Sequence, residues 1–309
     1  MKNLDFNKTT VTIEKNGLVL EGGAMRGMFT AGVLDVLMEH NIEFDGAIGV
    51  SAGATFGCNF KSKQIGRTIR YNMKYCNDPR YCSFRSLLKT GDLFGAEFCY
   101  HTLPEQLDLF DNETYEHSPM EFHIVCTDVN TGKPVYYKCD KFDHDGLEWV
   151  RASASMPLVS RIVEVGGRQM LDGGIADSIP LEYFQSIGYH RNLVVLTQPR
   201  DYVKKENKML PLMKLSLKRY PNLIETMRQR HVNYNQTLDY IRSEEKKGTV
   251  LVLCPKEKLP VGRIEHNPER LKHVYDLGRE VALENLEKIK TFLNCTEQPV
   301  SACSANNNF

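Results

Sequence analysis

The hydrophobic positions near the start of the chain form short continuous runs separated by stretches of helical spacing. The runs Gly17–Leu20 and Phe44–Val50 are short and apolar, as expected for buried strands. After Gly27 the apolar residues recur at helical spacing as far as residues 40–41, and residues 52–60 repeat the pattern. The sequence therefore predicts strand, glycine-rich loop, helix, strand, sharp turn and helix. Such a unit predicts an α/β fold with a parallel sheet and a right-handed crossover.

The rest of the chain contains further strand patterns and two long helical ones. Asn222–Lys247 predicts a long polar helix with one apolar side. Asn267, which is followed by a proline, predicts the start of a last helix that runs to about Phe292. Residues 61–120 predict only several short helices. Strands are predicted at Phe122–Asp128, Pro134–Cys139, Ile162–Val165, Gln169–Leu171, Leu193–Thr197 and Val250–Cys254, and a shorter helix at Leu147–Ser155.

No repeat and no clear linker divides the sequence, so we expect one domain over residues 1–295. Within it, the motifs described below fall in residues 17–200, and residues 205–295 form a helical C-terminal part. Residues 296–309 are polar and predict a disordered tail.

Composition narrows the class of protein. The 309 residues are 41% hydrophobic and 25% charged, with a formal net charge of zero, so no nucleic-acid partner is expected. The nine cysteines form no CxxC pair, so the spacing of a zinc ribbon or a thioredoxin-like site is missing and reduced thiols are expected. No cluster of metal-ligating residues is evident either, and we expect neither a metal nor a cofactor. No secretory leader and no run of ~18 apolar residues is evident, which predicts a cytoplasmic protein.

The first motif with chemical meaning is G-x-S-x-G at Gly49, Ser51 and Gly53. A strand pattern precedes Ser51 and a helical pattern follows it, as a nucleophile on a strained strand-to-helix turn requires. The helix N-terminus also brings free N–H groups and positive dipole close to the serine. The alternative is an ordinary glycine-rich turn with a capping serine.

The second motif is the loop Gly22-Gly23-Ala24-Met25-Arg26-Gly27, which ends the first strand and opens a helix. Glycines allow backbone N–H groups to point together at negative charge, either a phosphate or an oxyanion. The spacings of the Walker A and dinucleotide-binding loops are absent. The serine in the other glycine-rich turn favours an oxyanion hole, and a simple packing loop is the alternative.

A nucleophilic serine needs a base. None of the nine histidines (His40, His101, His117, His123, His144, His190, His231, His266 and His273) lies in a glycine-rich or strand-end setting. Asp172 does, because it follows an apolar run and precedes Gly173 and Gly174. Burial beside a serine would raise its pKa toward that of a useful base. An Asp-Gly turn with an Asx hydrogen bond is the competing interpretation.

The three motifs, in this order, resemble those of the patatin-like phospholipase family: a G-G-G-x-[RK]-G loop, a G-x-S-x-G elbow and a D-G-[GA] motif. Ala152–Pro157 also resembles the family's A-S-x-x-x-P stretch before the aspartate. The resemblance covers roughly residues 17–180 and the strand at 193–197. It implies a three-layer α/β/α sandwich with a mostly parallel sheet.

The resemblance also implies roles for individual residues. Ser51 would be the nucleophile and Asp172 its base, acting as a dyad without histidine. Backbone amides around Gly23, Ala24 and Met25 would form the oxyanion hole, and Arg26 would brace the loop or offer charge to a head group. One departure is Ala24, which stands where the family has its third glycine. It fits only with negative φ or with a left-handed backbone at some cost.

The implied function is hydrolysis of lipid or phospholipid esters through an acyl-enzyme, with peripheral contact at the inner face of a membrane. Residues 79–100 would line an acyl groove or form a mobile cap, or else belong to the core. The alternatives are an inactive scaffold or regulatory protein on the same fold, a transacylase, and a hydrolase that uses one of the histidines in a triad.

Overall fold

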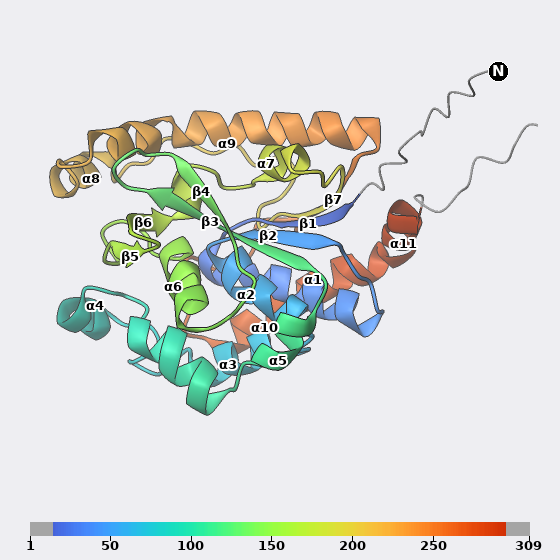
Figure 1. The fold of residues 1–309 in the computed structure, drawn as a ribbon, viewed down its shortest axis with the longest axis horizontal. Coiled ribbons are helices and arrows are strands. Elements are labelled where there is room, and N and C mark those ends of the chain that lie inside the picture. Colours follow the sequence, from blue (N-terminus) through green and yellow to red (C-terminus); the bar gives the residue numbers. More distant parts are fainter. Residues whose placement is uncertain (1–14, 295–309) are drawn as a thin grey trace, which may run out of the picture.

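A mixed sheet of eight strands runs through residues 15–294, the part of the chain that the computed structural model describes (Figure 1). The strand order is β5-β6-β3-β2-β1-β7-β8, and β4 pairs with β3. Five neighbouring strands are parallel to one another: β3, β2, β1, β7 and β8. The remaining strands, β4, β5 and β6, pair antiparallel. The strands are β1 (Asn16–Leu20), β2 (Gly46–Val50), β3 (Glu121–Asp128), β4 (Pro134–Lys138), β5 (Val163–Val165), β6 (Arg168–Asp172), β7 (Arg191–Val195) and β8 (Val250–Leu253).

Helices connect these strands and cover both faces of the sheet. The long ones are α1 (Gly27–Glu39), α2 (Ala52–Lys61), α3 (Arg67–Tyr75), α6 (His144–Ser153), α9 (Pro221–Lys247), α10 (Pro268–Glu284) and α11 (Leu286–Asn294). The short ones are α4 (Phe84–Thr90), α5 (Asn112–His117), α7 (Leu181–Ser186) and α8 (Leu210–Ser216). Two 3-10 turns, η1 (Ala24–Arg26) and η3 (Gly173–Ile175), and a π-helical segment, η2 (Phe98–Leu107), complete the described elements.

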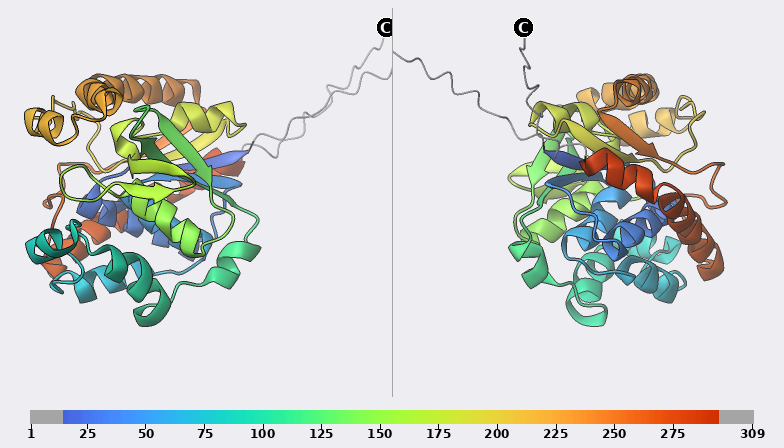
Figure 2. Two further views of the ribbon diagram at one scale, coloured as in Figure 1. Left: turned by 60° about the vertical axis from the view of Figure 1, so that its left-hand side comes forward. Right: turned by 90° about the vertical axis from the view of Figure 1, so that its right-hand side faces the viewer.

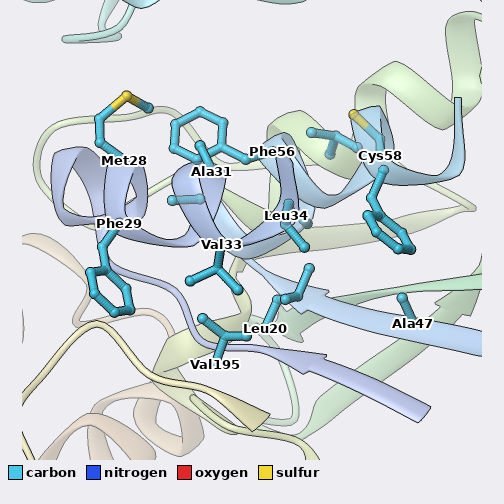
Figure 3. Close-up of a cluster of buried hydrophobic side chains, with 14 of the residues drawn as sticks. Leu20, Met28, Phe29, Ala31, Val33, Leu34, Ala47, Phe56, Cys58 and Val195 are labelled. Carbon is cyan, nitrogen blue, oxygen red and sulfur yellow. The ribbon is translucent and has the colours of Figure 1, made fainter. Parts of the chain in front are cut away.

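The predicted three-layer α/β/α sandwich is confirmed. Helices α7 and α9 lie over one face of the sheet, and α1, α2, α3 and α10 lie under the other (Figures 1 and 2). Side chains of β1 alternate between the two layers, since Leu18 and Leu20 pack in the core with α1 and α2 while Val19 packs with α7 and α9. Figure 3 shows Val33 of α1 pointing toward Leu20 of β1 and Val195 of β7.

One predicted element is wrong in extent. The last helix does not run unbroken to Phe292, because α10 ends at Glu284 and α11 begins at Leu286. Asn285 separates them: its φ of −103° and ψ of 6° leave the helical region, and its side chain donates to the carbonyl of Val281 at 2.8 Å. Asparagine favours such local hydrogen bonds over continued helix.

The single-domain arrangement stays a prediction. It is supported by the C-terminal part, since β8 pairs with β7 and Tyr275 of α10 donates a hydrogen bond to Asp35 of α1 at 2.8 Å. The predicted polar tail and the residues searched for a secretory leader lie outside the described residues, apart from Lys15. None of the helices between residues 15 and 294 combines the length and the hydrophobicity of a membrane-spanning segment.

The register of the sheet brings three motif-bearing strand ends to one edge. Strands β1 and β2 are parallel neighbours, so the loops that follow Leu20 and Val50 emerge side by side. Val50 lies beside Val125 of β3, and the next residue of β3, Cys126, lies beside Asp172 of β6. Ser51 and Asp172 therefore sit at the same level of the sheet, on opposite sides of β3.

Candidate active site

Ser51 occupies a strained turn between β2 and α2. Its φ of 54° and ψ of −119° lie in a region that residues with a side chain rarely adopt. The backbone reverses there at once, because the carbonyl of Ser51 already accepts hydrogen bonds from the amides of Ala54 and Thr55 of α2. The serine thus stands at the N-terminus of α2, whose first amides have no acceptor within the helix.

The two glycines of the elbow are required by close backbone contacts. A Cβ atom on Gly49 would stand 2.5 Å from the carbonyl oxygen of Gly53. A Cβ atom on Gly53 would stand 2.4 Å from the carbonyl oxygen of Leu20 in β1. Any side chain at either position would push α2 away from the sheet, and Ser51 would move with it.

The end of α6 holds both Ser51 and Asp172 in place. The hydroxyl of Ser153 accepts a hydrogen bond from the amide of Ser51 at 2.9 Å and donates to the carbonyl of Val125 at 2.6 Å. Two residues further, the carbonyl of Ser155 accepts from the amide of Asp172 at 2.8 Å. The stretch Ala152–Pro157 therefore ties the serine turn to the aspartate strand, a function that the sequence alone did not reveal.

Asp172 is buried, with 7% of its surface exposed, and the side chain of Ser51 is close enough to its carboxylate to lower the pKa of that carboxylate. The carboxylate accepts a hydrogen bond from the amide of Gly174 at 2.7 Å, which is the Asx hydrogen bond of the competing interpretation. The turn and the contact with Ser51 thus coexist. Burial raises the pKa of Asp172 above its ordinary value of 3.8, while the charge of Arg230, the side chain of Ser51 and the hydrogen bond from Gly174 oppose the rise.

The glycine-rich loop passes directly against the serine. A Cβ atom on Gly22 would stand 3.0 Å from the Cβ of Ser51. Ala24 adopts a left-handed backbone with φ of 48°, so the departure from glycine is accommodated at the cost of local strain. Ala24, Met25 and Arg26 then form the turn η1, which leads into α1 at Gly27. Amides at the start of such a turn lack intrahelical acceptors and face outward.

Glu21 braces this loop, and the sequence analysis assigned it no role. Its buried carboxylate accepts from the amide of Thr197 at 2.6 Å, from the Thr197 hydroxyl at 3.1 Å and from the hydroxyl of Tyr234 at 2.6 Å. The loop is thereby anchored to the end of β7 and to α9. A glutamate directly before the first glycine of the motif, at the end of a buried strand, is the signal that would have suggested it.

Two cavities meet at Ser51. The apolar cavity is lined by aromatic and aliphatic side chains that include Phe56, Tyr71, Tyr81, Phe94, Leu103 and Phe110. The polar cavity contains Asp172, Gly22, Gly23 and the four cations Arg26, Lys204, Arg230 and Arg263. Ala24, Ser51 and Met156 line both. Of residues 79–100, four line the apolar cavity, whereas Phe84 and Leu88 are exposed; the four are Tyr81, Phe94, Cys99 and Tyr100.

Arg230 is a second residue that the sequence analysis missed. It donates from Nε to the carbonyl oxygen of Gly174, beside Asp172. Its position was readable in principle, because it falls on the apolar side of α9, three residues after Met227 and four before Tyr234, both buried. A single arginine on an apolar helix face is a signal for a specific partner.

Neither cavity that Ser51 lines contains a histidine. The histidines have other surroundings, such as Glu121 for His123, Glu148 for His101 and the carbonyl of Cys76 for His266. Among residues 15–294, no group of three or more histidine, cysteine or acidic side chains is arranged to hold a metal ion.

The family model for patatin-like phospholipases matches residues 18–184, more than half of the chain. This chain therefore belongs to the patatin-like phospholipase family, which places it among lipid hydrolases at the level of the family. A second model, for a domain of unknown function (DUF6363), matches residues 220–294.

Relatives differ widely in length. The uncharacterized protein YjjU of Escherichia coli (strain K12) is 28% identical over 276 residues, which are 85% of this chain and 74% of that protein. The uncharacterized NTE family protein Mb1092c of Mycobacterium bovis is 26% identical over 53% of this chain and 44% of its own length. Lysophospholipase nte1 of Aspergillus oryzae is 25% identical over 56% of this chain, but that region is only 11% of the fungal protein.

Proposed function

We propose that this protein is a serine acyl-ester hydrolase acting on lipid esters, with Ser51 as nucleophile and Asp172 as the only general base. The observation that carries the proposal is the placement of the strained Ser51 beside the buried Asp172, whose pKa the serine side chain lowers, in a cavity without histidine. A serine held at positive φ and a buried carboxylate each cost free energy. We expect a protein without catalytic activity to have lost such costly features, so their presence argues against an inactive scaffold.

The reaction follows from this arrangement. Asp172 takes the proton of the Ser51 hydroxyl as the serine oxygen bonds to the ester carbonyl carbon. Amides of Gly23, Ala24 and Met25 stabilise the oxyanion. The tetrahedral intermediate then expels the alcohol, which receives the proton from Asp172, and leaves an acyl-serine. Water, deprotonated by Asp172, releases the fatty acid and restores the serine.

The two cavities divide the substrate between them. The apolar cavity suits an acyl chain, since its lining consists mainly of aromatic and aliphatic side chains. The polar cavity, on the side of Asp172, suits the alcohol part, which must receive a proton from that carboxylate. The fungal relative is a lysophospholipase by name, which supports a lipid substrate of this kind.

We further propose that α4 and α8 contact a lipid surface. Both helices lie at the same end of the molecule in Figures 1 and 2. Residues 156–159, which line the polar cavity, connect to both: the amide of Leu93, shortly after α4, donates a hydrogen bond to the carbonyl of Val159. On the other side, Met209 and Met213 of the α8 region line the same cavity. Phe84 and Leu88 are 74% and 89% exposed, and Leu215 is 71% exposed. Exposed cations accompany these apolar side chains: Arg85, Lys89, Lys214 and Lys218. Apolar tips flanked by cations are typical of surfaces that bind anionic membranes.

The direct test is hydrolysis of chromogenic esters of increasing acyl length by the wild type, Ser51→Ala and the control Ser186→Ala, which alters an exposed serine of α7. Hydrolysis should fall by roughly 10³-fold or more in Ser51→Ala alone. Hydrolysis that survives in Ser51→Ala would overturn the nucleophile. A folded wild type inert toward every ester and toward lysophospholipid micelles would favour the scaffold interpretation.

A further inference from the structure

Four cations converge on the polar cavity from four separate segments of the chain. Arg26 comes from η1, Lys204 from the connection between β7 and α8, Arg230 from α9, and Arg263 from the connection between β8 and α10. Residues so far apart in sequence meet only because the fold brings them to the same side of Ser51. This gathering extends well beyond the motifs that define the family.

In the described part of the chain, none of these cations has a carboxylate partner, although Arg26, Lys204 and Arg230 are half-buried and only Arg263 is exposed. Within residues 15–294, none of the four forms an ion pair within 4.0 Å of an acidic side chain. Nε of Arg26 is buried without a hydrogen-bond partner. Arg230 donates to a backbone carbonyl, and Nζ of Lys204 lies 4.0 Å from the ring centroid of Tyr234.

Two acidic side chains, Glu21 and Asp172, also line the polar cavity, and both are already engaged. Glu21 accepts hydrogen bonds from Thr197 and Tyr234, and Asp172 accepts one from the amide of Gly174 and lies beside the side chain of Ser51. The cavity therefore carries more positive than negative charge. Such mutual repulsion between cations costs free energy unless an anion binds among them.

The pKa of Lys204 is lowered in this cavity. Burial, the charge of Arg230 and the charges of Arg26 and Arg263 lower the pKa of Lys204 to about 7, against the opposing effect of Glu21. A bound anion would raise the pKa of Lys204 back toward its ordinary value. Titration of Lys204 near neutral pH should therefore make anion binding in this cavity depend on pH.

We propose that the polar cavity binds the phosphate of an anionic head group, so that the preferred substrate is an acyl ester of a phosphorylated alcohol without a cationic group. This inference rests on the proposed function. Guanidinium and ammonium groups are the side chains best suited to phosphate oxygens. A choline or ethanolamine head group would bring a further positive charge among four others and is disfavoured.

The test compares three substrates with the same short acyl chain, used as monomers so that membrane binding plays no part. They are the lysophosphatidylglycerol, the lysophosphatidylcholine and the neutral monoacylglycerol. The wild type should show the highest kcat/KM with the anionic ester. Lys204→Met should lower the ratio of anionic to neutral kcat/KM by about tenfold, the loss expected for one charge-assisted hydrogen bond. Lys204→Arg should keep the ratio, and so should Lys205→Met, an exposed lysine outside the cavity.

The pH dependence separates a charge effect from loss of structure. The phosphodiester has constant charge near neutrality, so kcat/KM for the anionic ester should fall as pH rises through about 7, where free Lys204 loses its proton. This alkaline limb should vanish in Lys204→Arg, because arginine stays charged. A wild type that treats the three esters alike, or an alkaline limb that persists in Lys204→Arg, would overturn the inference while leaving Ser51-dependent hydrolysis intact.

Binding to Ser51→Ala, measured by calorimetry, tests the inference even without turnover. The lysophosphatidylglycerol should bind more tightly than the monoacylglycerol, and more tightly than glycerol phosphate or inorganic phosphate alone. If inorganic phosphate binds as tightly as the acylated ligand, the cavity is a site for free phosphate and the assignment to a lipid head group is wrong.

Discussion

Ser51 and Asp172 line the same cavity across the end of β3, close enough for the serine side chain to lower the pKa of the aspartate, although 120 residues separate the two in sequence. The contact depends on register, since Val50 lies beside Val125 and Asp172 lies beside Cys126. A slip of β6 by one residue would turn the carboxylate to the opposite face of the sheet. The strand pairing thus fixes the proposed dyad before any side chain is positioned.

Replacing Asp172 with asparagine should abolish turnover and change the pH dependence of stability. Burial raises the pKa of Asp172 in the folded protein. The stabilising proton is then bound at low pH and lost as pH rises through the folded-state pKa. Asparagine carries no charge and avoids this loss. The Tm of Asp172→Asn minus the Tm of the wild type should therefore increase as pH rises from acidic to neutral. A Tm difference that is constant with pH, in thermal melts across that range, would contradict the buried charge.

The pH profile of ester hydrolysis should reflect a carboxylate rather than an imidazole. Asp172 must be ionised to accept the proton of Ser51, so kcat/KM for a neutral ester should fall as pH decreases, with a midpoint above 3.8 because burial raises the pKa. Single replacement of each of the nine histidines by glutamine should leave this acid limb in place. A histidine variant that folds but has no turnover would establish a triad instead.

The elbow glycines should be intolerant of the smallest side chain. In Gly53→Ala the added methyl group would meet the carbonyl oxygen of Leu20 at 2.4 Å, so we expect a loss of about 1–3 kcal/mol in the free energy of unfolding and lower kcat. Gly262→Ala is the matched control, since its nearest neighbour would be 3.7 Å away. Chemical denaturation of both variants measures the difference, and equal stability would show that α2 shifts without cost.

Membrane binding should depend on the exposed apolar side chains of α4 and α8. Replacing both Leu88 and Leu215 by serine should weaken sedimentation with anionic vesicles by roughly a hundredfold or more, because each of the two side chains loses ~1.5–3 kcal/mol of burial. Leu283→Ser, at an exposed position of α10, should bind as the wild type does. Hydrolysis of monomeric ester should be the same in the wild type and in both variants. Equal vesicle binding by the double variant and the wild type would exclude this surface.

The sequence by itself determined the local elements and the motif chemistry. Runs of apolar residues, the glycines of the elbow and the Asn267 cap all act over a few residues, so their consequences were readable without the fold. The break at Asn285 was missed because the apolar spacing continues through it, while the hydrogen bond of its side chain decides the backbone locally. The left-handed backbone of Ala24 could not be predicted from the sequence either, since alanine has no preference for that conformation.

Only the tertiary structure decided what surrounds the serine. Glu21, Ser153 and Arg230 act through partners 176, 102 and 56 residues away in sequence, and no periodicity encodes such distances. The gathering of Lys204 and Arg263 beside Arg26 depends on where β7 and β8 end relative to β1, which is a property of sheet order. Short-range patterns specify elements and turns, whereas the charge and shape of a cavity arise from long-range packing that the sequence expresses only once it is folded.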